Sequence, residues 1–406
     1  MKIVIIGNSV AGQTVAEELI RANIIKDGHE ITNITKEPHP YYTRIFLPQY
    51  IAGKINIEKL YVRNFDWYSK NNINLMTGIK AEKLDLNKKL VHLKDIKEPI
   101  SYDKLVLATG SNARKFPFEN PNAKGVFTLR TIEDANEIIK YIKNNNVKNA
   151  VIIGGGLLGI ELSYNLKDLN IEVTICEIEN RILPRQLCEK SSKFLENYLK
   201  NQGIKLIFKK SVKKILTDNE TNKINGIEFE NGEILKTDIA FQQVGIIPNI
   251  ELAKNSGIKT NKGIIVNEYL ETSEKDIFAA GDCIEFNNQI WGIIPPSIEQ
   301  AKIVANNILA KSKNEFKKYK PTIWQTKLKI AGIDVLSIGE IEPIDSANSE
   351  VIWKIDENLN NCRKIILERN KLVGAILIGS GIDSKYFINN MNKEISIQEL
   401  KQKIFE

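Results

Sequence analysis

Two glycine-rich turns have the residue types and the spacing that bind a dinucleotide. One of them reads Gly154-Gly155-Gly156-Leu157-Leu158-Gly159, the complete G-x-G-x-x-G pattern. Its first glycine makes the tight turn, the second lets a pyrophosphate approach the backbone, and the third packs helix on strand. Glu177 follows about 20 residues later, where a carboxylate accepts a hydrogen bond from a ribose 2′-hydroxyl. That carboxylate would repel a 2′-phosphate, so NADH is favoured over NADPH, although Arg181 and Arg185 are close enough in sequence to bind a phosphate.

The other turn, near the N-terminus, is a degenerate copy of this pattern. It reads Gly7-Asn8-Ser9-Val10-Ala11-Gly12, with serine in place of the second glycine. The serine hydroxyl can hydrogen-bond a phosphate, and the helix that follows presents N–H groups to an anion. From these residues alone, dinucleotide binding and a simple tight turn are both open. Thr35 or Glu37 would meet the ribose, or Glu37 would be an ordinary solvated loop residue.

Cysteine and histidine offer little further chemistry. The four cysteines have no C-x-x-C spacing, and the three histidines are scattered. This excludes a disulfide framework and a cysteine-only or histidine-rich metal site, so we expect no metal. We expect Cys283 and the other cysteines to be small buried residues. The chemistry must therefore come from a bound cofactor.

The elements that position the two turns follow one pattern twice. Each copy consists of a strand, the glycine turn, a helix and a second strand, and two such copies predict an α/β fold with two doubly wound, Rossmann-like domains. The expected elements are strands at Lys2–Ile6, Glu30–Thr35, Ala150–Ile153 and Glu172–Glu177 and helices at Ala11–Ala22 and Ile160–Leu169.

The rest of the chain predicts further strands and a small third domain. We expect strands at Leu105–Leu107 and Asp276–Asp282 and a helix at Pro295–Leu309, followed by a lysine-rich linker to Lys320. Beyond it, strand-like runs predict a small α+β C-terminal domain, with strands at Leu328–Ile333, Lys364–Glu368 and Leu372–Ile378.

Length and composition agree with a multidomain globular protein. The 406 residues are 42% hydrophobic and 26% charged, which argues against wholesale disorder. No apolar run approaches the roughly 20 residues of a membrane span, and no export signal precedes Gly7, so we expect a cytoplasmic protein without a membrane partner. The net charge is +7, with lysines gathered in 205–214 and 311–320. These lysines are either solvated surface or a docking face for an acidic partner; nucleic acid is not expected.

Several further motifs, taken in order, resemble one family. The flavin-loop-like segment is Pro40-Tyr41-Tyr42-Thr43-Arg44-Ile45-Phe46-Leu47-Pro48, and the turns are Ala108-Thr109-Gly110 and Ala280-Gly281-Asp282. Further matches are Tyr102–Ser111 and Arg181–Leu187, and Gly245–Asn249 and Ile298–Ala301 match less closely. Together with the glycine turns, they resemble the pyridine nucleotide-disulfide oxidoreductase superfamily, most closely its rubredoxin reductase and nitrite reductase flavoprotein branch. The resemblance covers residues 1 to about 310 and continues more weakly to about 380.

This resemblance implies two cofactors, FAD and NADH, and a role for each matched residue. The residues that would hold FAD are Gly7, Ser9, Ala11, Gly12, Glu37, Arg44, Ala81, Ala108, Thr109, Gly110, Gly281, Asp282 and Ser297, the last at a helix start aimed at the flavin. The residues that would hold NADH are Gly154, Gly156, Leu158, Gly159, Glu161, Glu177 and Gly245, with Glu161 near the nicotinamide. No protein side chain is expected to be catalytic, except that Glu161 stays a candidate.

Two departures from the family pattern affect these roles. Many relatives carry a lysine just after the Arg44 loop, paired with the glutamate that matches Glu161; here the stretch is Pro48-Gln49-Tyr50. Either Glu161 has another partner, or its role is reduced. Ile247 also replaces the arginine of the G-x-R-P-N motif. In addition, no cysteine precedes Cys176, so the thiol chemistry of many relatives is excluded.

The resemblance implies an FAD-dependent NADH oxidoreductase that passes electrons to an external acceptor, most simply a small acidic redox protein such as rubredoxin. One alternative is the NADH-oxidising flavoprotein subunit of a larger complex, of the nitrite reductase or 2-oxoacid oxidoreductase type. Another is a redox-sensing nucleotide-binding interaction protein. Homo-oligomerisation stays open. The expected domains are FAD-binding at 1–113 and 241–320, NADH-binding at 114–240, and a C-terminal interface or flavin-shielding domain at 321–406. Trp291 and Trp324 would lie near the flavin or in the core.

Overall fold

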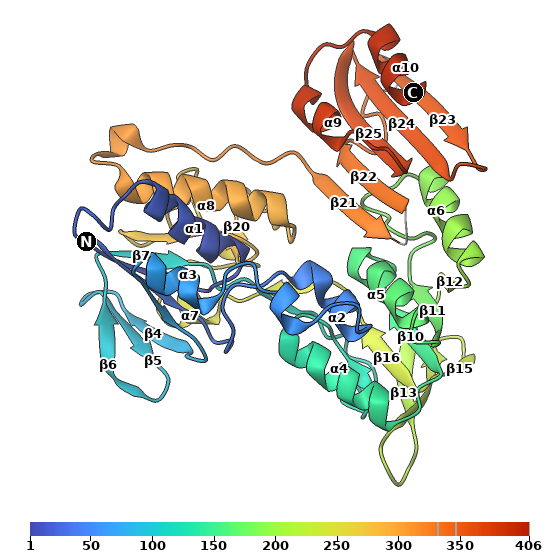
Figure 1. Cartoon of the computed structure of the whole chain (residues 1–406), viewed down its shortest axis with the longest axis horizontal. Helices are drawn as coiled ribbons and strands as arrows, with labels where there is room; N and C mark the ends of the chain where they lie inside the picture. The colour runs from blue at the N-terminus through green and yellow to red at the C-terminus, as the bar shows by residue number, and fades with distance from the viewer. Residues whose placement is uncertain (331–332, 346, 406) are drawn as a thin grey trace. The chain divides into compact units, whose positions relative to one another are not determined.

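In a computed structural model, which describes residues 1–330, 333–345 and 347–405, the chain forms two compact units (Figure 1). Unit 1 comprises Met1–Arg44, Asn56–Asn112 and Ile246–Thr322. Unit 2 comprises Ile45–Ile55, Ala113–Gly245 and Ile323–Glu406. Each unit is therefore assembled from segments that lie far apart in the sequence.

A five-stranded parallel sheet forms the centre of unit 1. Its strand order is β19-β7-β1-β2-β3. The strands are short and largely apolar because a parallel sheet is covered on both faces. Their bounds are β1 (Lys2–Ile6), β2 (Glu30–Ile34), β3 (Ile73–Met76), β7 (Lys104–Leu107) and β19 (Ile277–Ala279). The expected strand at Asp276–Asp282 is shorter than predicted, because the chain turns at Gly281 with a positive φ of 92°.

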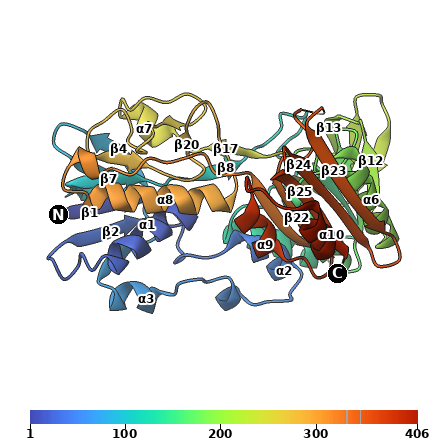
Figure 2. The same cartoon turned by 90° about the horizontal axis from the view of Figure 1, so that it is seen from above.

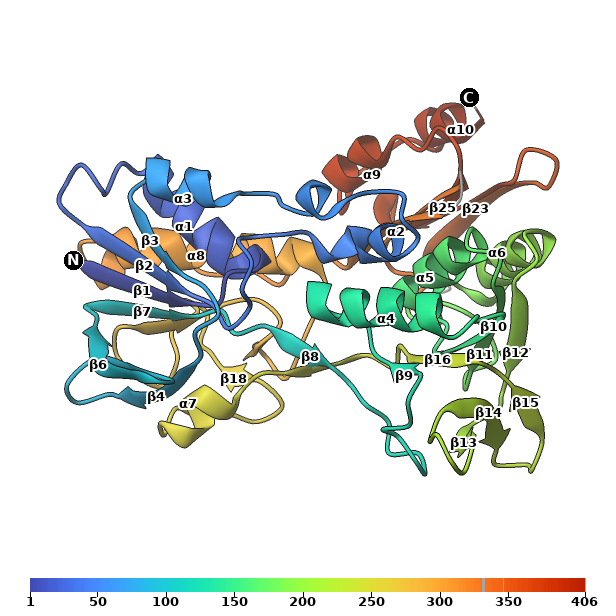
Figure 3. The same cartoon turned by 60° about the horizontal axis from the view of Figure 1, so that its bottom comes forward.

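Two long helices of unit 1 pack side by side, α1 (Val10–Arg21) and α8 (Ile294–Leu309), as Figure 2 shows. Both carry the expected helical apolar face. Shorter helices are α3 (Phe65–Lys70) and α7 (Glu251–Asn255). Smaller sheets accompany the parallel sheet: β4 (Ala81–Asp85), β5 (Leu90–Leu93) and β6 (Ile96–Ser101); β8 (Ser111–Ala113) with β17 (Ile246–Pro248); and β18 (Ile264–Ile265) with β20 (Ile284–Glu285). Strands β4, β6, β8 and β18 are labelled in Figure 3.

Unit 2 contains the second copy of the βαβ pattern. Its parallel sheet has the order β12-β11-β10-β16-β9, with β9 (Val126–Phe127), β10 (Asn149–Ile153), β11 (Glu172–Glu177), β12 (Lys205–Phe208) and β16 (Ile239–Gln242). The helices are α2 (Leu47–Ile51), α4 (Ile132–Asn144), α5 (Leu157–Lys167) and α6 (Glu189–Asn201). An antiparallel sheet of β13 (Val212–Thr217), β14 (Ile224–Phe229) and β15 (Ile234–Lys236) is attached. Helix α2 packs against α4 and α5.

The C-terminal part of unit 2 is an antiparallel sheet with helices, as the sequence predicted. The strand order is β21-β22-β25-β24-β23. The bounds are β21 (Gln325–Ile330), β22 (Ile333–Gly339), β23 (Ser349–Asp356), β24 (Asn361–Glu368), β25 (Lys371–Gly379), α9 (Ser384–Asn390) and α10 (Ile397–Phe405). The single strand expected at Leu328–Ile333 was wrong, since its ends belong to two antiparallel strands; residues 331–332 lie outside the described residues.

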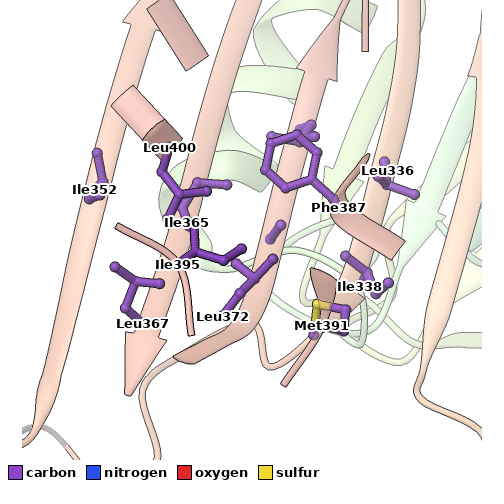
Figure 4. Packing of buried hydrophobic residues seen from close by; sticks show 12 residues of the cluster. Leu336, Ile338, Ile352, Ile365, Leu367, Leu372, Phe387, Met391, Ile395 and Leu400 are labelled. Atoms are coloured by element: carbon purple, nitrogen blue, oxygen red, sulfur yellow. The ribbon is translucent and has the colours of Figure 1, made fainter. Parts of the chain in front are cut away.

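The two faces of this C-terminal sheet cover different parts of unit 2. Leu336, Ile338 and their neighbours form one buried cluster with Phe387 of α9 and Leu400 of α10 (Figure 4). Between those two strand residues, Ser337 points the other way and donates a hydrogen bond to the Gln186 carbonyl at 2.6 Å. Side chains alternate along a strand, so this second face meets the α6 region of unit 2.

The lysine-rich stretch that was expected to be a linker is packed on unit 1. The Phe316 ring lies 5.7 Å from Tyr269 and 6.3 Å from Phe278, between ring centroids. Tyr319 is only 4% exposed, and its N–H donates to the Glu268 carbonyl at 2.7 Å. The linker prediction was therefore wrong: lysines dominate the composition, but the aromatic residues between them attach the stretch to the domain.

Candidate functional site

The first glycine turn needs its glycines for close packing. Gly7 has a positive φ of 115°, and a Cβ there would lie 1.9 Å from the Ala108 carbonyl oxygen. A Cβ on Gly12 would lie 1.9 Å from the Gly7 carbonyl oxygen. Ser9 is the N-cap of α1, yet among the described residues its side chain caps no N–H, and the first turn of α1 has no acidic residue. The α1 N-terminus is thus suited to an anion.

Other expected FAD residues of unit 1 gather around this turn. A Cβ on Gly281 would lie 2.9 Å from the Ala11 Cβ and 3.7 Å from the Ser297 Oγ. The Asp282 carboxylate accepts a hydrogen bond from the Ser111 hydroxyl at 2.8 Å. Thr109, which together with Gly110 follows β7, donates its hydroxyl to the Asn249 carbonyl at 2.7 Å.

The structure brings Glu37 together with the flavin-loop-like segment. Arg44 donates to one Glu37 carboxylate oxygen at 2.7 Å, and the Tyr42 hydroxyl donates to the other. Burial alone would raise the pKa of Glu37, but the Arg44 charge and these hydrogen bonds lower it overall. Glu37 is therefore an ionised carboxylate that orients Arg44. The Glu37 N–H also approaches the Thr35 hydroxyl, at 3.3 Å.

Ala81 begins β4, after a short segment that contacts the residues following β2. The Ile79 N–H donates to the Thr35 carbonyl at 2.9 Å, and the Gly78 N–H donates to the Glu37 carbonyl at 3.0 Å. Ala81 itself is 8% exposed. The segment that leads to Ala81 thus lies beside Thr35 and Glu37, beyond the carboxyl end of β2.

A buried polar network under the first turn was not foreseen. The Tyr68 hydroxyl of α3 donates to the Gln13 side-chain oxygen at 2.6 Å and accepts from the Asn8 amide at 3.0 Å. Asn33 of β2 donates to the Asn8 Oδ1 at 2.8 Å. Burial raises the pKa of Tyr68 to about 12. The network fixes Asn8, a member of the glycine turn, and so fixes the path of the turn.

The second glycine turn, in unit 2, has the same close contacts and one open position. A Cβ on Gly154 would lie 2.4 Å from the Gln243 carbonyl oxygen, and a Cβ on Gly159 would lie 2.4 Å from the Gly154 carbonyl oxygen. Among the described residues, by contrast, nothing lies within 4 Å of the Gly156 Cβ position, and no side chain caps α5. Leu158 lies in the first turn of this helix. The arrangement leaves room for a pyrophosphate at the α5 N-terminus.

Glu177 lies beside this turn, at the end of β11. One oxygen accepts from the Gly155 N–H at 2.6 Å, and the other accepts from the Glu179 N–H at 3.1 Å. Arg181 is bound within its own loop, to the carbonyls of Leu187 and Pro184, both at 3.3 Å.

Glu161 of α5 has no side-chain partner among the described residues. Burial raises its pKa to about 8, so its carboxyl group is largely protonated at neutral pH. In the segment without the family's lysine, Tyr50 donates to the Asn136 side chain at 2.8 Å, and Lys54 pairs with Asp168 at the end of α5. A protonated carboxyl group can donate a hydrogen bond to a carbonyl oxygen of a bound ligand.

Gln243 and Gly245 follow β16 at the same edge of the sheet. The Gln243 side-chain Nε2 is buried without a hydrogen-bond partner among the described residues, which marks a donor that a ligand can satisfy. Gly245 has a positive φ of 101° and is exposed. Sequence reasoning missed Gln243, because a single glutamine carries no pattern.

The cysteines cannot relay electrons. All four are buried free thiols. Burial raises the pKa of Cys176 to about 12, that of Cys362 to about 11, and that of Cys283 as well. Thiolates are the reactive form, so the raised pKa values of Cys176, Cys283 and Cys362 disfavour thiol chemistry at neutral pH. Among the described residues no group of histidine, cysteine, aspartate or glutamate could hold a metal ion.

Both turns fit a dinucleotide. In each, a close-packed glycine precedes an uncapped helix N-terminus, and an acidic residue lies at or just beyond the end of the next strand. Two such turns on two parallel sheets are the arrangement found in flavoprotein oxidoreductases with a nicotinamide substrate, which bind two dinucleotides. The chain belongs to the pyridine nucleotide-disulphide oxidoreductase family, whose model matches residues 1–305. Residues 325–395 match the rubredoxin NAD⁺ reductase C-terminal domain.

Individual relatives agree with this membership. The chain is 34% identical over 398 residues to the nitrite reductase [NAD(P)H] of Bacillus subtilis, covering 98% of this chain but only 48% of that enzyme. It is 32% identical to the NADH-rubredoxin oxidoreductase of Clostridium acetobutylicum, covering 93% of this chain and 91% of the relative. The crystal structure of the NADH:rubredoxin oxidoreductase from that organism matches with a TM-score of 0.74 and 30% identity, covering 98% and 97% of the two chains.

Family membership confirms the expected resemblance, the two Rossmann-like domains with a C-terminal domain, and an oxidoreductase of the flavoprotein type. FAD and NADH are confirmed as cofactors at the level of the family. The chain spans about half the length of the first curated relatives it matches. Within the described residues, no helix combines the length and the apolar character that crossing a bilayer requires.

Proposed function

We propose that the chain binds FAD at the first glycine turn and NADH at the second, and passes electrons from NADH to an external acceptor. The observation that carries this proposal is the pair of uncapped helix N-termini at Ser9 and Gly156, each behind a close-packed glycine. The proposed FAD domain is 1–113 with 241–320, the NADH domain is 114–240, and 321–406 is an interface domain. The absence of a reactive thiol among the described residues supports an outside acceptor.

The residues have separate tasks in this proposal. In the FAD site, Gly7, Ser9 and Gly12 bind the pyrophosphate, Arg44 is held by Glu37 along the cofactor, and Asp282 binds the ribityl chain. When bound, FAD would supply an acceptor for the hydride of NADH, and it would pass the two electrons to the external acceptor and the proton to solvent. In the NADH site, Gly154 and Gly156 bind the pyrophosphate and Glu177 binds the ribose. Glu161, protonated at neutral pH, and the unpartnered amide of Gln243 donate hydrogen bonds to the nucleotide. No side chain has to take up a proton during hydride transfer, so positioning is the main contribution.

We propose a small acidic redox protein of the rubredoxin type as the acceptor, in the cytoplasm. The net charge of +7 favours an acidic partner. The two lysine clusters are not the best candidates for the docking face, because several of their lysines already pair with acidic residues of their own unit. These pairs are Lys205 with Glu172, Lys210 with Glu233, Lys213 with Glu228, Lys214 with Glu119, Lys313 with Glu271 and Lys318 with Glu268.

A second candidate is the NADH-oxidising part of a larger assembly. It is favoured by the relatives that are about twice as long, among them the nitrite reductase and an assimilatory nitrate reductase electron transfer subunit from Bacillus subtilis. In that case, the acceptor would be a further domain or chain rather than rubredoxin.

Rapid anaerobic mixing of the FAD-loaded protein with NADH tests the proposal. We expect the flavin absorbance to bleach quickly with NADH and more slowly with NADPH. Rubredoxin should then reoxidise the flavin faster than oxygen does. A flavin that NADH does not bleach would contradict the enzyme and favour a redox-sensing interaction protein. Bleaching without a rubredoxin advantage would favour the larger assembly.

A further inference from the structure

A buried chain of hydrogen bonds begins at the Gly281 turn of unit 1. The Gly281 N–H donates to the Gln300 side-chain oxygen at 2.8 Å. The amide nitrogen of Gln300 lies 3.4 Å from the Tyr319 hydroxyl. Gln300 is 1% exposed and Tyr319 is 4% exposed, so neither side chain can exchange this partner for water. The chain thus leads from the backbone of the turn, through α8, to the lysine-rich stretch.

The same chain continues to the last residue of unit 1. The Tyr319 hydroxyl and the Thr322 hydroxyl are 2.8 Å apart, and Thr322 donates to the Glu299 carboxylate at 2.5 Å. Because Thr322 uses its hydrogen on Glu299, Tyr319 donates to Thr322 and accepts from Gln300. Every donor then points toward the carboxylate, an arrangement in which neighbouring hydrogen bonds strengthen one another.

Aromatic packing holds the Tyr319 ring in place. Its centroid lies 5.4 Å from that of Phe286 and 5.9 Å from that of Trp291. Rings packed in this way fix the direction in which the hydroxyl points. The hydroxyl therefore holds the Gln300 side chain in one position, and Gln300 in turn holds the Gly281 N–H.

We propose that Gln300 and Tyr319 are positioning residues that set the Gly281–Asp282 turn for FAD. The inference rests on the proposed FAD site. Gly281 has no side chain with which to hold the turn, and no larger residue fits there, because its φ is 92° and an added Cβ would lie 2.9 Å from the Ala11 Cβ. The next residue carries the carboxylate assigned to the cofactor. Displacing the turn by a fraction of an ångström moves that carboxylate, and so changes both FAD affinity and the potential of the bound flavin.

The first test compares two tyrosine-to-phenylalanine variants of the full chain after removal of flavin. Tyr319→Phe keeps the packed ring and removes the hydroxyl that links Gln300 to Thr322. Tyr269→Phe is the matched control, because Tyr269 packs on Phe316 in the same region and lies outside the hydrogen-bond chain. We expect FAD titration to give an affinity about fivefold weaker for Tyr319→Phe, the loss of one hydrogen bond, and no change for the control.

The second test uses Thr322 and the midpoint potential of the bound flavin, which a loss of stability alone would not move. Thr322→Val should shift the potential in the same direction as Tyr319→Phe, and Thr322→Ser, which retains the hydroxyl, should restore it. Equal FAD affinity for both tyrosine variants, or a valine effect that serine does not reverse, would overturn the inference and leave the proposed function standing. A wild-type chain that takes up no FAD would overturn both.

Discussion

The Glu177 carboxylate accepts a hydrogen bond from the backbone N–H of Gly155 at 2.6 Å, which joins the end of β11 to the glycine turn before α5. The residue proposed to select NADH therefore also holds the turn proposed to bind its pyrophosphate. Charge and the Gly155 contact can be separated by substitution, because glutamine keeps one accepting oxygen for the Gly155 N–H and loses both the charge and the acceptor of the Glu179 N–H.

Glu177→Gln should relax the choice between NADH and NADPH and leave the turn in place. The neutral amide no longer repels a 2′-phosphate, and we expect the ratio of kcat/KM values for NADH over NADPH to fall about tenfold. Glu177→Ala also removes the Gly155 contact, so KM for NADH should rise as well. Steady-state kinetics with both nucleotides measures this, with exposed Glu179→Gln as control. An unchanged ratio in the glutamine variant would remove the charge argument.

The half-buried carboxyl group of Glu161 should make stability depend on pH. Its pKa in the folded protein is about 8, against an ordinary value of 4.5, so the folded state holds the extra proton between these pH values. The free energy of unfolding should therefore fall as pH rises from about 4.5 to about 8, by on the order of a few kcal/mol. Glu161→Gln should flatten this part of the Tm–pH curve, while exposed Glu137→Gln should not. Parallel Tm–pH curves for wild type and Glu161→Gln would contradict a raised pKa of Glu161 in the folded protein.

Loss of the Tyr68 hydroxyl should destabilise the structure around the first glycine turn. Tyr68→Phe leaves the buried Asn8 and Gln13 side chains without that partner, at a cost of about 1–3 kcal/mol in the free energy of unfolding. Urea denaturation measures the cost, and FAD titration measures its effect on the cofactor. Tyr50→Phe removes one exposed hydrogen bond, to Asn136, and serves as control. Equal stabilities of the two variants would argue against a structural role for the network.

The cysteines should be dispensable for electron transfer. Their thiols are buried, and burial raises the pKa of Cys283 at the Asp282 turn. A variant with Cys283→Ala should therefore bleach with NADH at nearly the wild-type rate, and native protein should react with a thiol reagent only on unfolding. Stopped-flow absorbance and a thiol assay check the two statements. Loss of bleaching in this variant, with FAD still bound, would restore a thiol to the mechanism.

The sequence by itself determined the local elements and the positions of both turns. Strands such as Lys2–Ile6 and Glu172–Glu177 occur where predicted, because a short buried apolar run and a following glycine are local properties. Spacing alone also placed Glu177 beside the Gly154 turn, since a βαβ unit has a nearly fixed length.

Only the tertiary structure decided which polar side chains meet. Nothing in the sequence joins Gln300 to Tyr319, Tyr68 to Asn8, or Glu37 to both Tyr42 and Arg44, because these contacts depend on which elements pack together. The burial of Glu161 and of the Gln243 amide likewise depends on neighbouring segments rather than on neighbouring residues. Burial and pairing set the charge and direction of each side chain, so the sequence predicted where the cofactors bind, and the fold decided how the surrounding groups are held.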